Sequence, residues 1–107
     1  MKSDLKLLTK SELKKVIARV PEWKMDSKQT KLTKTFDFDK HIDGLIFIAR
    51  ISVNAEILKH HPDIHFTYAK VKITVTTHEM NGLTKRDLLL VQRIENISQT
   101  LQVDKNE

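Results

Sequence analysis

The sequence contains no cysteine, and only two glycines and two prolines among its 107 residues. Without cysteine, the chain can form neither disulfide bonds nor cysteine-ligated zinc sites. Its two glycines, Gly44 and Gly82, do not make a glycine-rich loop of the kind that binds phosphate. No serine stands in the glycine-flanked turn typical of hydrolases. These absences argue against nucleophilic catalysis, and the scarcity of glycine and proline predicts short connections between elements.

Long hydrophobic runs are also missing. The N-terminal segment MKSDLKLLTK has no apolar run long enough for a signal peptide, and no stretch approaches the length of a membrane span. We therefore expect a soluble, cytoplasmic protein without membrane contact. A chain of 107 residues, 39% of them hydrophobic, suits a single domain over residues 1–107 with one modest core. Oligomerisation is a common way for such a domain to bury more surface.

The formal net charge is +5, which suggests contact with an anionic partner. Acidic and basic residues are nevertheless interleaved, as in KSDLK, KSELKK and KRD. Interleaved charges are typical of a solvated surface rather than of a nucleic-acid interface. The sequence also lacks aromatic residues interleaved on a basic strand face. We therefore do not expect nucleic acid as a partner.

The first third of the sequence predicts one helix and two strands. Thr9 and Glu12 form a capping-box pattern, so we expect the helix to begin at Thr9. Pro21 stops it, because proline cannot continue a helical hydrogen-bond ladder. The segments EWKMD and KQTKLTKTFDF then read as strands, joined by a turn at DSK.

A long helix is predicted in the middle of the chain. We expect it to begin at Asp39 or Lys40, with Asp39 as its candidate cap, and to end at His60 or His61. Pro62 disfavours the helical conformation of the residue before it, so the helix should not extend further. Apolar residues occur on more than one face of this helix, which suggests burial against something beyond its own sheet.

The last third predicts a hairpin, a turn and a final helix. Two runs alternate between apolar and polar residues, one over residues 64–68 and one over residues 71–75. Asn81 and Gly82 mark a turn, and Thr84 then caps the last helix with Asp87 at the third helical position. The order α-β-β-α-β-β-α predicts an α+β domain, a four-stranded antiparallel sheet with helices packed on one face.

Four of the five histidines lie between residues 60 and 78. One histidine before Pro62 would need no explanation, because histidine is favourable at a helix C-terminus. Two adjacent ones, His60 and His61, point about 100° apart on a helix and reach different atoms of one ligand. This spacing suits acid and base roles on a flat heterocycle better than metal chelation, so we expect no metal site. His65 and His41 have no evident partner in the sequence.

Two carboxylates could support these histidines. Glu56 precedes His60 by four residues, on the same helix face, and would form either a surface pair or an orienting contact. Asp87 has a capping role already, which is compatible with orienting a histidine.

The segments AEILKHHP (residues 55–62) and THEMNGLTKRD (residues 77–87), at this separation, resemble the pterin-4a-carbinolamine dehydratase family. The resemblance is continuous from about residue 36 to about residue 94. It implies a lyase that removes water from 4a-hydroxytetrahydropterin, the carbinolamine left by pterin-dependent aromatic hydroxylases, to give quinonoid dihydropterin. It also implies a histidine acid–base mechanism, no metal or organic cofactor, and a homo-oligomer, either a dimer or a tetramer.

The resemblance implies a set of site residues as well. His60, His61 and His78 match the family's three catalytic histidines. We expect His61 and His78 to transfer protons and His60 to bind or polarise the hydroxyl, while the sequence leaves open which is the acid and which the base. Five further residues are expected to orient the histidines or hold the pterin: Glu56, Thr76, Thr77, Glu79 and Asp87.

An alternative hypothesis keeps this fold without the reaction, as a non-catalytic binding or assembly module. The intact motif histidines favour the enzyme. The chain departs from many family members after Pro62, where Ile64 and His65 stand in place of an aromatic pair. The sequence leaves open the physiological pterin, the oligomer size and any second role in regulation or assembly.

Overall fold

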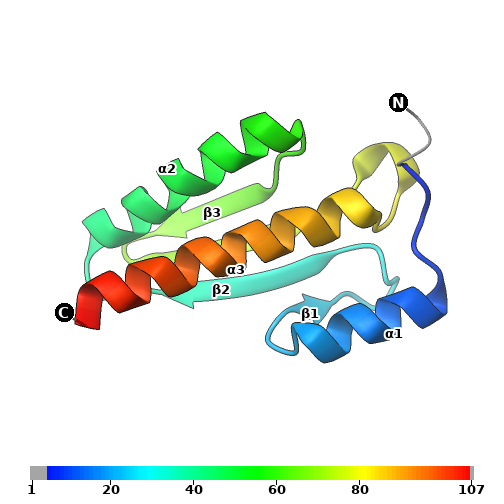
Figure 1. Cartoon of the computed structure of the whole chain (residues 1–107), viewed down its shortest axis with the longest axis horizontal. Helices are drawn as coiled ribbons and strands as arrows, with labels where there is room; N and C mark the ends of the chain where they lie inside the picture. Colours follow the sequence, from blue (N-terminus) through cyan, green and yellow to red (C-terminus); the bar gives the residue numbers. More distant parts are fainter. Residues whose placement is uncertain (1–4, 107) are drawn as a thin grey trace.

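The computed structural model describes residues 5–106. Within that range the chain forms three α-helices, a four-stranded sheet and one short 3-10 helix (Figure 1). The helices are α1 (Lys10–Arg19), α2 (His41–Leu58) and α3 (Lys85–Asn106). The strands are β1 (Lys24–Met25), β2 (Leu32–Asp37), β3 (Asp63–Thr67) and β4 (Lys70–Val75), and the 3-10 helix is η2 (His78–Met80).

All neighbouring strands are antiparallel, and their order across the sheet is β1-β2-β4-β3. Helices α2 and α3 contact each other and β4, and α1 lies beside β1 (Figure 1). This arrangement confirms the predicted α+β fold and the predicted order α-β-β-α-β-β-α. None of the helices described is both long enough and apolar enough to cross a lipid bilayer.

Helices α1 and α3 begin as the sequence predicted. The Thr9 hydroxyl accepts from the Glu12 amide, and the Glu12 carboxylate accepts from the Thr9 amide at 2.9 Å. That backbone hydrogen bond from Thr9 lowers the pKa of Glu12. At α3, the Thr84 hydroxyl accepts from the Arg86 amide at 3.3 Å, and Asp87 Oδ2 accepts from the Thr84 amide at 2.9 Å. Both predicted capping patterns are therefore confirmed.

Helix α2 ends earlier than predicted. Lys59 adopts the left-handed conformation, with φ 53° and ψ 40°. The Lys59 amide donates to the Glu56 carbonyl at 3.3 Å, and the His60 amide donates to the Ala55 carbonyl at 3.1 Å. These two bonds form a Schellman motif, which satisfies the last helical carbonyls and turns the chain away. The prediction that Pro62 ends the helix is therefore wrong, and both motif histidines lie beyond it.

Helix α2 begins at His41, one residue after the later of its two predicted starts, Asp39 and Lys40. Lys40, not Asp39, occupies the N-cap position, and its side chain makes no capping hydrogen bond. The helix approaches the sheet closely at Gly44, where an added Cβ would stand 2.7 Å from Phe66 Cε1. Glycine is required here by the short distance between the helix and the sheet, since that separation leaves no room for a side chain.

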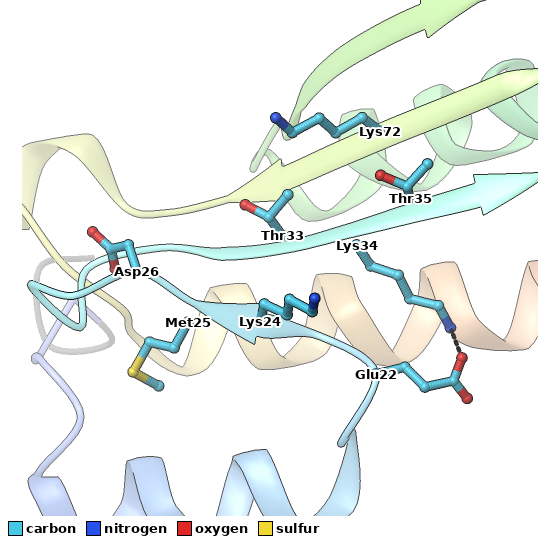
Figure 2. Close-up of a pocket in the computed structure, with 8 residues that line it drawn as sticks. All are labelled: Glu22, Lys24, Met25, Asp26, Thr33, Lys34, Thr35 and Lys72. Carbon is cyan, nitrogen blue, oxygen red and sulfur yellow. Dashed lines mark ion pairs between the residues drawn. The ribbon is translucent and has the colours of Figure 1, made fainter.

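A hollow of about 520 Å³ lies beside β1 (Figure 2). Figure 2 shows Thr33 and Lys72 projecting to one side of the sheet, while Lys34 projects to the other. Lys34 interrupts the apolar side of β2, and its ammonium lies 2.7 Å from Glu95 on α3 and 3.4 Å from Glu22. These pairs compensate the charge on the side of β2 that carries the core residues.

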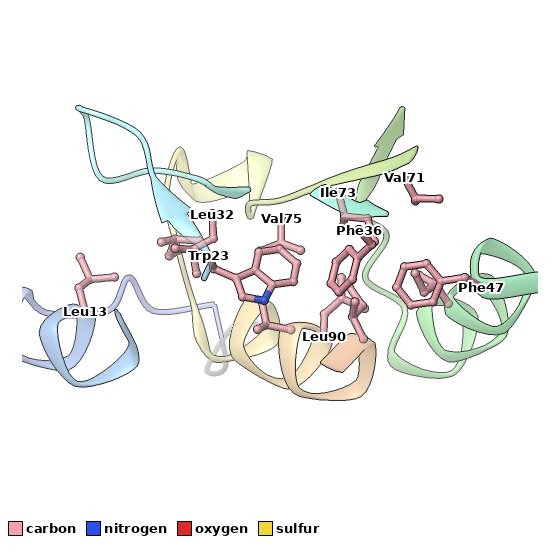
Figure 3. Packing of buried hydrophobic residues seen from close by; sticks show 13 residues of the cluster. Leu13, Trp23, Leu32, Phe36, Phe47, Val71, Ile73, Val75 and Leu90 are labelled. Carbon is pink, nitrogen blue, oxygen red and sulfur yellow. The ribbon is translucent and has the colours of Figure 1, made fainter. Parts of the chain in front are cut away.

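The core lies between the sheet and the helices (Figure 3). Trp23 meets the Phe36 ring edge-on at a centroid distance of 6.0 Å, and Phe36 lies 4.8 Å from Phe47 of α2. The Trp23 indole N–H donates to Glu95 at 2.9 Å, so the ring is buried without an unpaired donor. Leu90 of α3 is fully buried in the same cluster. These contacts fix α2 and α3 against the strands that carry the site.

The outer side of α2 is apolar and exposed. Five large residues of this helix are exposed: Ile42, Leu45, Ile46, Val53 and Ile57. The opposite side of the helix carries its buried residues, including Phe47 and Ile51. The apolar residues on the outer side of α2 are thus exposed in the single chain, and their burial against something beyond the sheet stays a prediction.

Candidate active site

Two connections converge at one end of the sheet. One is the α2–β3 connection (residues 59–62), and the other is the segment from β4 to α3 (residues 76–84). β3 and β4 pair antiparallel, with Asp63 opposite Thr74, so the start of β3 lies beside the end of β4. The pairing brings the α2–β3 connection and the segment after β4 to the same end of the molecule (Figure 1). His60, His61 and His78 belong to these two segments, and His78 lies beside Asp63 at the start of β3.

His60 is held by a buried carboxylate. Its residue exposure is 8%, and its Nε2 lies 2.6 Å from Oδ1 of the fully buried Asp87. Because an ionised carboxylate only accepts hydrogen bonds, Nε2 of His60 carries the hydrogen that it donates. Oδ2 of Asp87 accepts from the Thr77 hydroxyl at 2.7 Å and from the Thr84 amide at 2.9 Å. Asp87 therefore caps α3 and orients His60 at the same time.

The hydroxyls of Thr77 and Thr84 extend this network, and the donor of each hydrogen bond can be assigned. Thr77 uses its single hydroxyl hydrogen on Asp87, so the 2.8 Å contact between Thr77 and Thr84 must be donated by Thr84. Thr84 in turn accepts from the Arg86 amide. Among the described residues, no buried side-chain nitrogen or oxygen lacks a hydrogen-bond partner. The His60 side chain therefore lies at the end of a buried hydrogen-bond network in which every polar side-chain atom has a partner.

His61 lies in the opposite kind of environment. Its side chain is 60% exposed, and its Nε2 contacts Oε2 of Glu56, which is itself exposed. We predicted that Glu56 would support His60, but the early end of α2 brings it to His61 instead. The left-handed Lys59 shifts the two histidines out of the helical spacing on which that prediction depended.

His78 begins η2 and lies beside the start of β3. Its side chain is 69% exposed, and its Nε2 stands 3.8 Å from Asp63 Oδ2. The turn that follows contains Asn81 in the left-handed conformation, with φ 50°. Thr77 and Gly82 form an antiparallel bridge across the turn, with the Thr77 amide donating to the Gly82 carbonyl at 2.9 Å. This bridge fixes the backbone on either side of His78.

A cavity of about 540 Å³ opens beside His78. One wall consists of Thr76, His78 and Asn81, and the other is the β1–β2 loop (residues 26–31). The Thr76 hydroxyl donates to the Thr30 carbonyl at 2.6 Å, which joins the two walls. The sequence predicted a turn in this loop but not its position beside His78. The only sequence pattern that marked this loop was the DSK turn. A turn pattern does not indicate which distant segment the loop will contact.

The remaining predicted site residues differ in exposure. Thr76 and Thr77 are buried, and both hydroxyls are bound within the protein. Glu79 is exposed on η2, next to His78. Two histidines stand apart from this cluster: His65 is exposed on β3, and His41 stacks on Phe66 at a centroid distance of 4.6 Å. Among the residues whose side chains the structure describes, no group of three or more histidines and carboxylates is arranged to hold a metal ion.

Comparisons with known proteins agree on one family. The family model described as "Pterin 4 alpha carbinolamine dehydratase" matches residues 6–97. A protein of Nostoc punctiforme whose name assigns it to that family is 39% identical over 92 residues, covering 85% of this chain and 96% of its own. A protein of Prochlorococcus marinus with the same name is 35% identical over 91 residues, covering 85% of this chain and 94% of its own.

Solved structures show the same fold. The crystal structure of a transcriptional coactivator/pterin dehydratase from Brucella melitensis superposes with a TM-score of 0.82 at 28% identity, over 86% of this chain and 98% of that one. A pterin dehydratase-like protein, described as a RuBisCO assembly factor in the alpha-carboxysome, gives a TM-score of 0.61 at 21% identity, over 71% of this chain and 88% of that one. The similarity to the RuBisCO assembly factor concerns the fold alone. Taken with the matched residues, these findings establish that the chain belongs to the pterin-4-alpha-carbinolamine dehydratase family.

Proposed function

We propose that this protein is a hydro-lyase that converts 4a-hydroxytetrahydropterin to quinonoid dihydropterin and water. One observation carries the proposal beyond family membership. A buried, oriented histidine, His60, lies at the same end of the sheet as two exposed histidines, His61 and His78. The exposed pair can reach a ligand from solvent, while the buried one has a fixed ring orientation.

The reaction requires two proton movements and no change of oxidation state. The C4a hydroxyl leaves as water after it gains a proton, and a ring nitrogen loses a proton as the new double bond forms. Histidine suits both steps, because its ordinary pKa lies near neutrality and it can donate or accept. The balance of atoms and charge is complete without a metal or an organic cofactor.

Each histidine has a role in this proposal. His61 and His78 transfer the protons, one as the imidazolium that donates to the leaving hydroxyl and the other as the neutral base. His60 binds or polarises the hydroxyl, with its ring orientation supported by the 2.6 Å contact to Asp87. Glu56 orients His61, in place of the His60 contact that the sequence suggested.

The other site residues act around these histidines. Thr77 acts through Asp87, since its hydroxyl is bound to that carboxylate. Thr76 forms part of the cavity wall, and Glu79 places an exposed carboxylate next to His78 where it can accept from the pterin edge. Pterin amides and amines are hydrogen-bond donors, which matches a carboxylate acceptor.

The test is dehydration of freshly generated 4a-hydroxytetrahydropterin, followed against the spontaneous rate. Wild type should exceed that rate, and His61→Ala and His78→Ala should each lose most of the enhancement. His65→Ala is the matched control, because His65 is also an exposed histidine but lies on β3 outside the cluster. A wild type no faster than the spontaneous reaction rejects the enzyme. Full activity in both site variants rejects the assignment of residues.

The second candidate is a non-catalytic assembly module. Its support is the fold shared with the RuBisCO assembly factor, which at 21% identity is a likeness of architecture only. The same assay separates the two functions, because a module that only binds leaves the spontaneous dehydration rate unchanged.

The proposal includes self-association through α2. Its exposed apolar side would face water in a monomer, and the α2 sides of two or more copies could cover one another. Val53→Glu, in the middle of that side, should dissociate the oligomer, as measured by light scattering. Lys59→Glu, an exposed change next to the C-terminus of α2, is the control. A monomeric wild type would contradict this part of the proposal.

A further inference from the structure

The β1–β2 loop has a conformation that is held by several hydrogen bonds. Oδ1 of Asp26 accepts from the amides of Thr30 and Lys31, at 2.7 and 2.9 Å, and Oδ2 accepts from the Thr30 hydroxyl at 2.7 Å. Gln29 takes the left-handed conformation, with φ 59°, and Thr76 ties the loop to the segment after β4. The shape of the cavity beside His78 therefore depends on this loop.

The carboxylate of Asp26 is occupied by the loop itself. Burial acts to raise the pKa of Asp26, but the hydrogen bonds from Thr30 and Lys31 outweigh it and hold the pKa below its ordinary value. The group is thus an ionised acceptor whose two oxygens receive three hydrogen bonds from its own loop.

The other charged groups lining the cavity are basic. Lys28 and Lys31 line it with exposed side chains, opposite His78. Neither lysine pairs with a carboxylate of the described residues, whereas Asp26 is satisfied within its loop and Asp63 stands beside His78. The lining between the loop and His78 therefore includes two lysines whose positive charge is not paired with a carboxylate in the described part of the chain.

The chemistry of pterins indicates which ligand group that is. C4a, which carries the leaving hydroxyl, is bonded to N5, and N5 is bonded to C6, where natural pterins differ in their substituent. A residue that exchanges a proton with the C4a hydroxyl or with N5 thus stands close to that substituent. In the proposed reaction His78 acts at the C4a hydroxyl or at N5, and His78 also forms one wall of the cavity. The C6 substituent is then the part of the substrate that would lie nearest to this cavity.

Resting on the proposed dehydratase function, we infer that the cavity beside His78 receives the C6 substituent and that Lys28 and Lys31 select pterins in which it is anionic. A phosphate monoester is the chemical class that fits, since a dianion can pair with both ammonium groups. The two lysines determine specificity and take no part in the proton transfers. Both are exposed, so their effect should weaken as ionic strength rises.

The experiment compares two substrates that differ only in the phosphate. Tetrahydroneopterin and its terminal phosphate monoester, each converted to the 4a-hydroxy form, are assayed at low ionic strength. The measured quantity is the ratio of kcat/KM for the phosphorylated substrate to that for the neutral one. Wild type should favour the phosphorylated substrate, and Lys28→Ala and Lys31→Ala should each lower the ratio about threefold, the double variant about tenfold, as for partly solvated charge pairs.

Lys70→Ala is the matched control. It removes the same charge, but Lys70 pairs with Asp37 at 2.8 Å near the β3–β4 turn, at the opposite end of β4 from Thr76. The ratio should not change in this variant. Lys31→Ala is also structurally mild, because Asp26 binds only the Lys31 backbone amide.

The possible failures are distinguishable. If wild type dehydrates both substrates with equal efficiency, or if the lysine variants leave the ratio unchanged, the inference is overturned while the dehydratase stands. If Lys70→Ala lowers the ratio as much as the loop variants do, the effect comes from net charge and the inference is again overturned. If wild type accelerates neither reaction, the proposed function itself fails and the inference falls with it.

Discussion

Two histidine–carboxylate pairs in this molecule have the same chemistry but opposite surroundings. The side chain of His60 is 9% exposed against a fully buried Asp87, while the side chain of His61 is 60% exposed against an exposed Glu56. In the buried pair, each polar group depends on its partner, because water cannot replace a lost hydrogen bond. In the exposed pair, water can replace it. The buried pair therefore fixes the orientation of the His60 ring, whereas the exposed pair leaves the His61 ring accessible to a ligand.

Removing the carboxylate of the buried pair should have the largest effect. Asp87→Ala leaves His60, Thr77 and the Thr84 amide without their shared acceptor, so the free energy of unfolding should fall by about 3–5 kcal/mol. Equilibrium unfolding in urea measures this. Asp87→Asn, which keeps the shape and one acceptor oxygen, should lose less. A loss below about 1 kcal/mol for Asp87→Ala would show that the network is not needed for stability.

Replacing each histidine separates stability from activity. His60→Ala leaves Asp87 partly unpaired in a buried site, so the free energy of unfolding should fall by about 1–3 kcal/mol together with activity. His61→Ala should lower the dehydration rate by about 10²–10⁴-fold, as for loss of a general acid or base. Its free energy of unfolding should change by no more than about 0.5 kcal/mol, as for an exposed position. Equal losses of stability in the two variants would contradict the contrast.

Two pairs of threonine hydroxyls, one buried and one partly buried, allow the same comparison of buried and exposed hydrogen bonds. Thr77→Val removes the hydroxyl that links Thr84 to Asp87, and the free energy of unfolding should fall by about 1–2 kcal/mol. Thr33→Val is the matched control, because Thr33 and Thr74 form a similar hydroxyl pair at 3.1 Å that is only partly buried. The control should change the free energy of unfolding by less than about 0.5 kcal/mol. Both values come from the same urea experiment. A larger loss of stability in the control would contradict the expectation that the buried hydroxyl pair contributes more.

Glu56→Gln should have the smallest effect on stability. The pair with His61 is exposed, so losing its charge should change the free energy of unfolding by about 0–0.5 kcal/mol. The dehydration rate should fall by a few-fold, because His61 would lose the group that orients it. A loss of stability close to that of Asp87→Ala would mean that the exposed pair is structural.

The local parts of this structure could be predicted from the sequence. The capping patterns at Thr9 and Thr84 occur within a few residues, and each side chain binds an amide two or three positions away. The strand alternation is equally local. Asp87 was predicted at the third position of the last helix, and its oxygen accepts from the Thr84 amide there. Such features depend on backbone hydrogen bonding between near neighbours, which the order of residues determines.

The partner of each histidine could not be predicted in that way. The early end of α2 depends on Lys59 in the left-handed conformation, which is uncommon for a residue other than glycine and has no signal in the sequence. That one backbone change moved Glu56 from its expected contact with His60 to His61. The β1–β2 loop likewise reaches His78 only because β1, β2 and β4 are neighbours in the sheet.

By itself, the sequence determined the order of the elements, the starts of α1 and α3, and the family to which the motif histidines belong. Only the tertiary structure decided that His60 is buried against Asp87, 27 residues away, and that His61 and His78 remain exposed. The physical reason is the range of the interactions. Caps and alternation follow from neighbours in the chain, whereas burial and side-chain pairing follow from how distant helices and strands pack together.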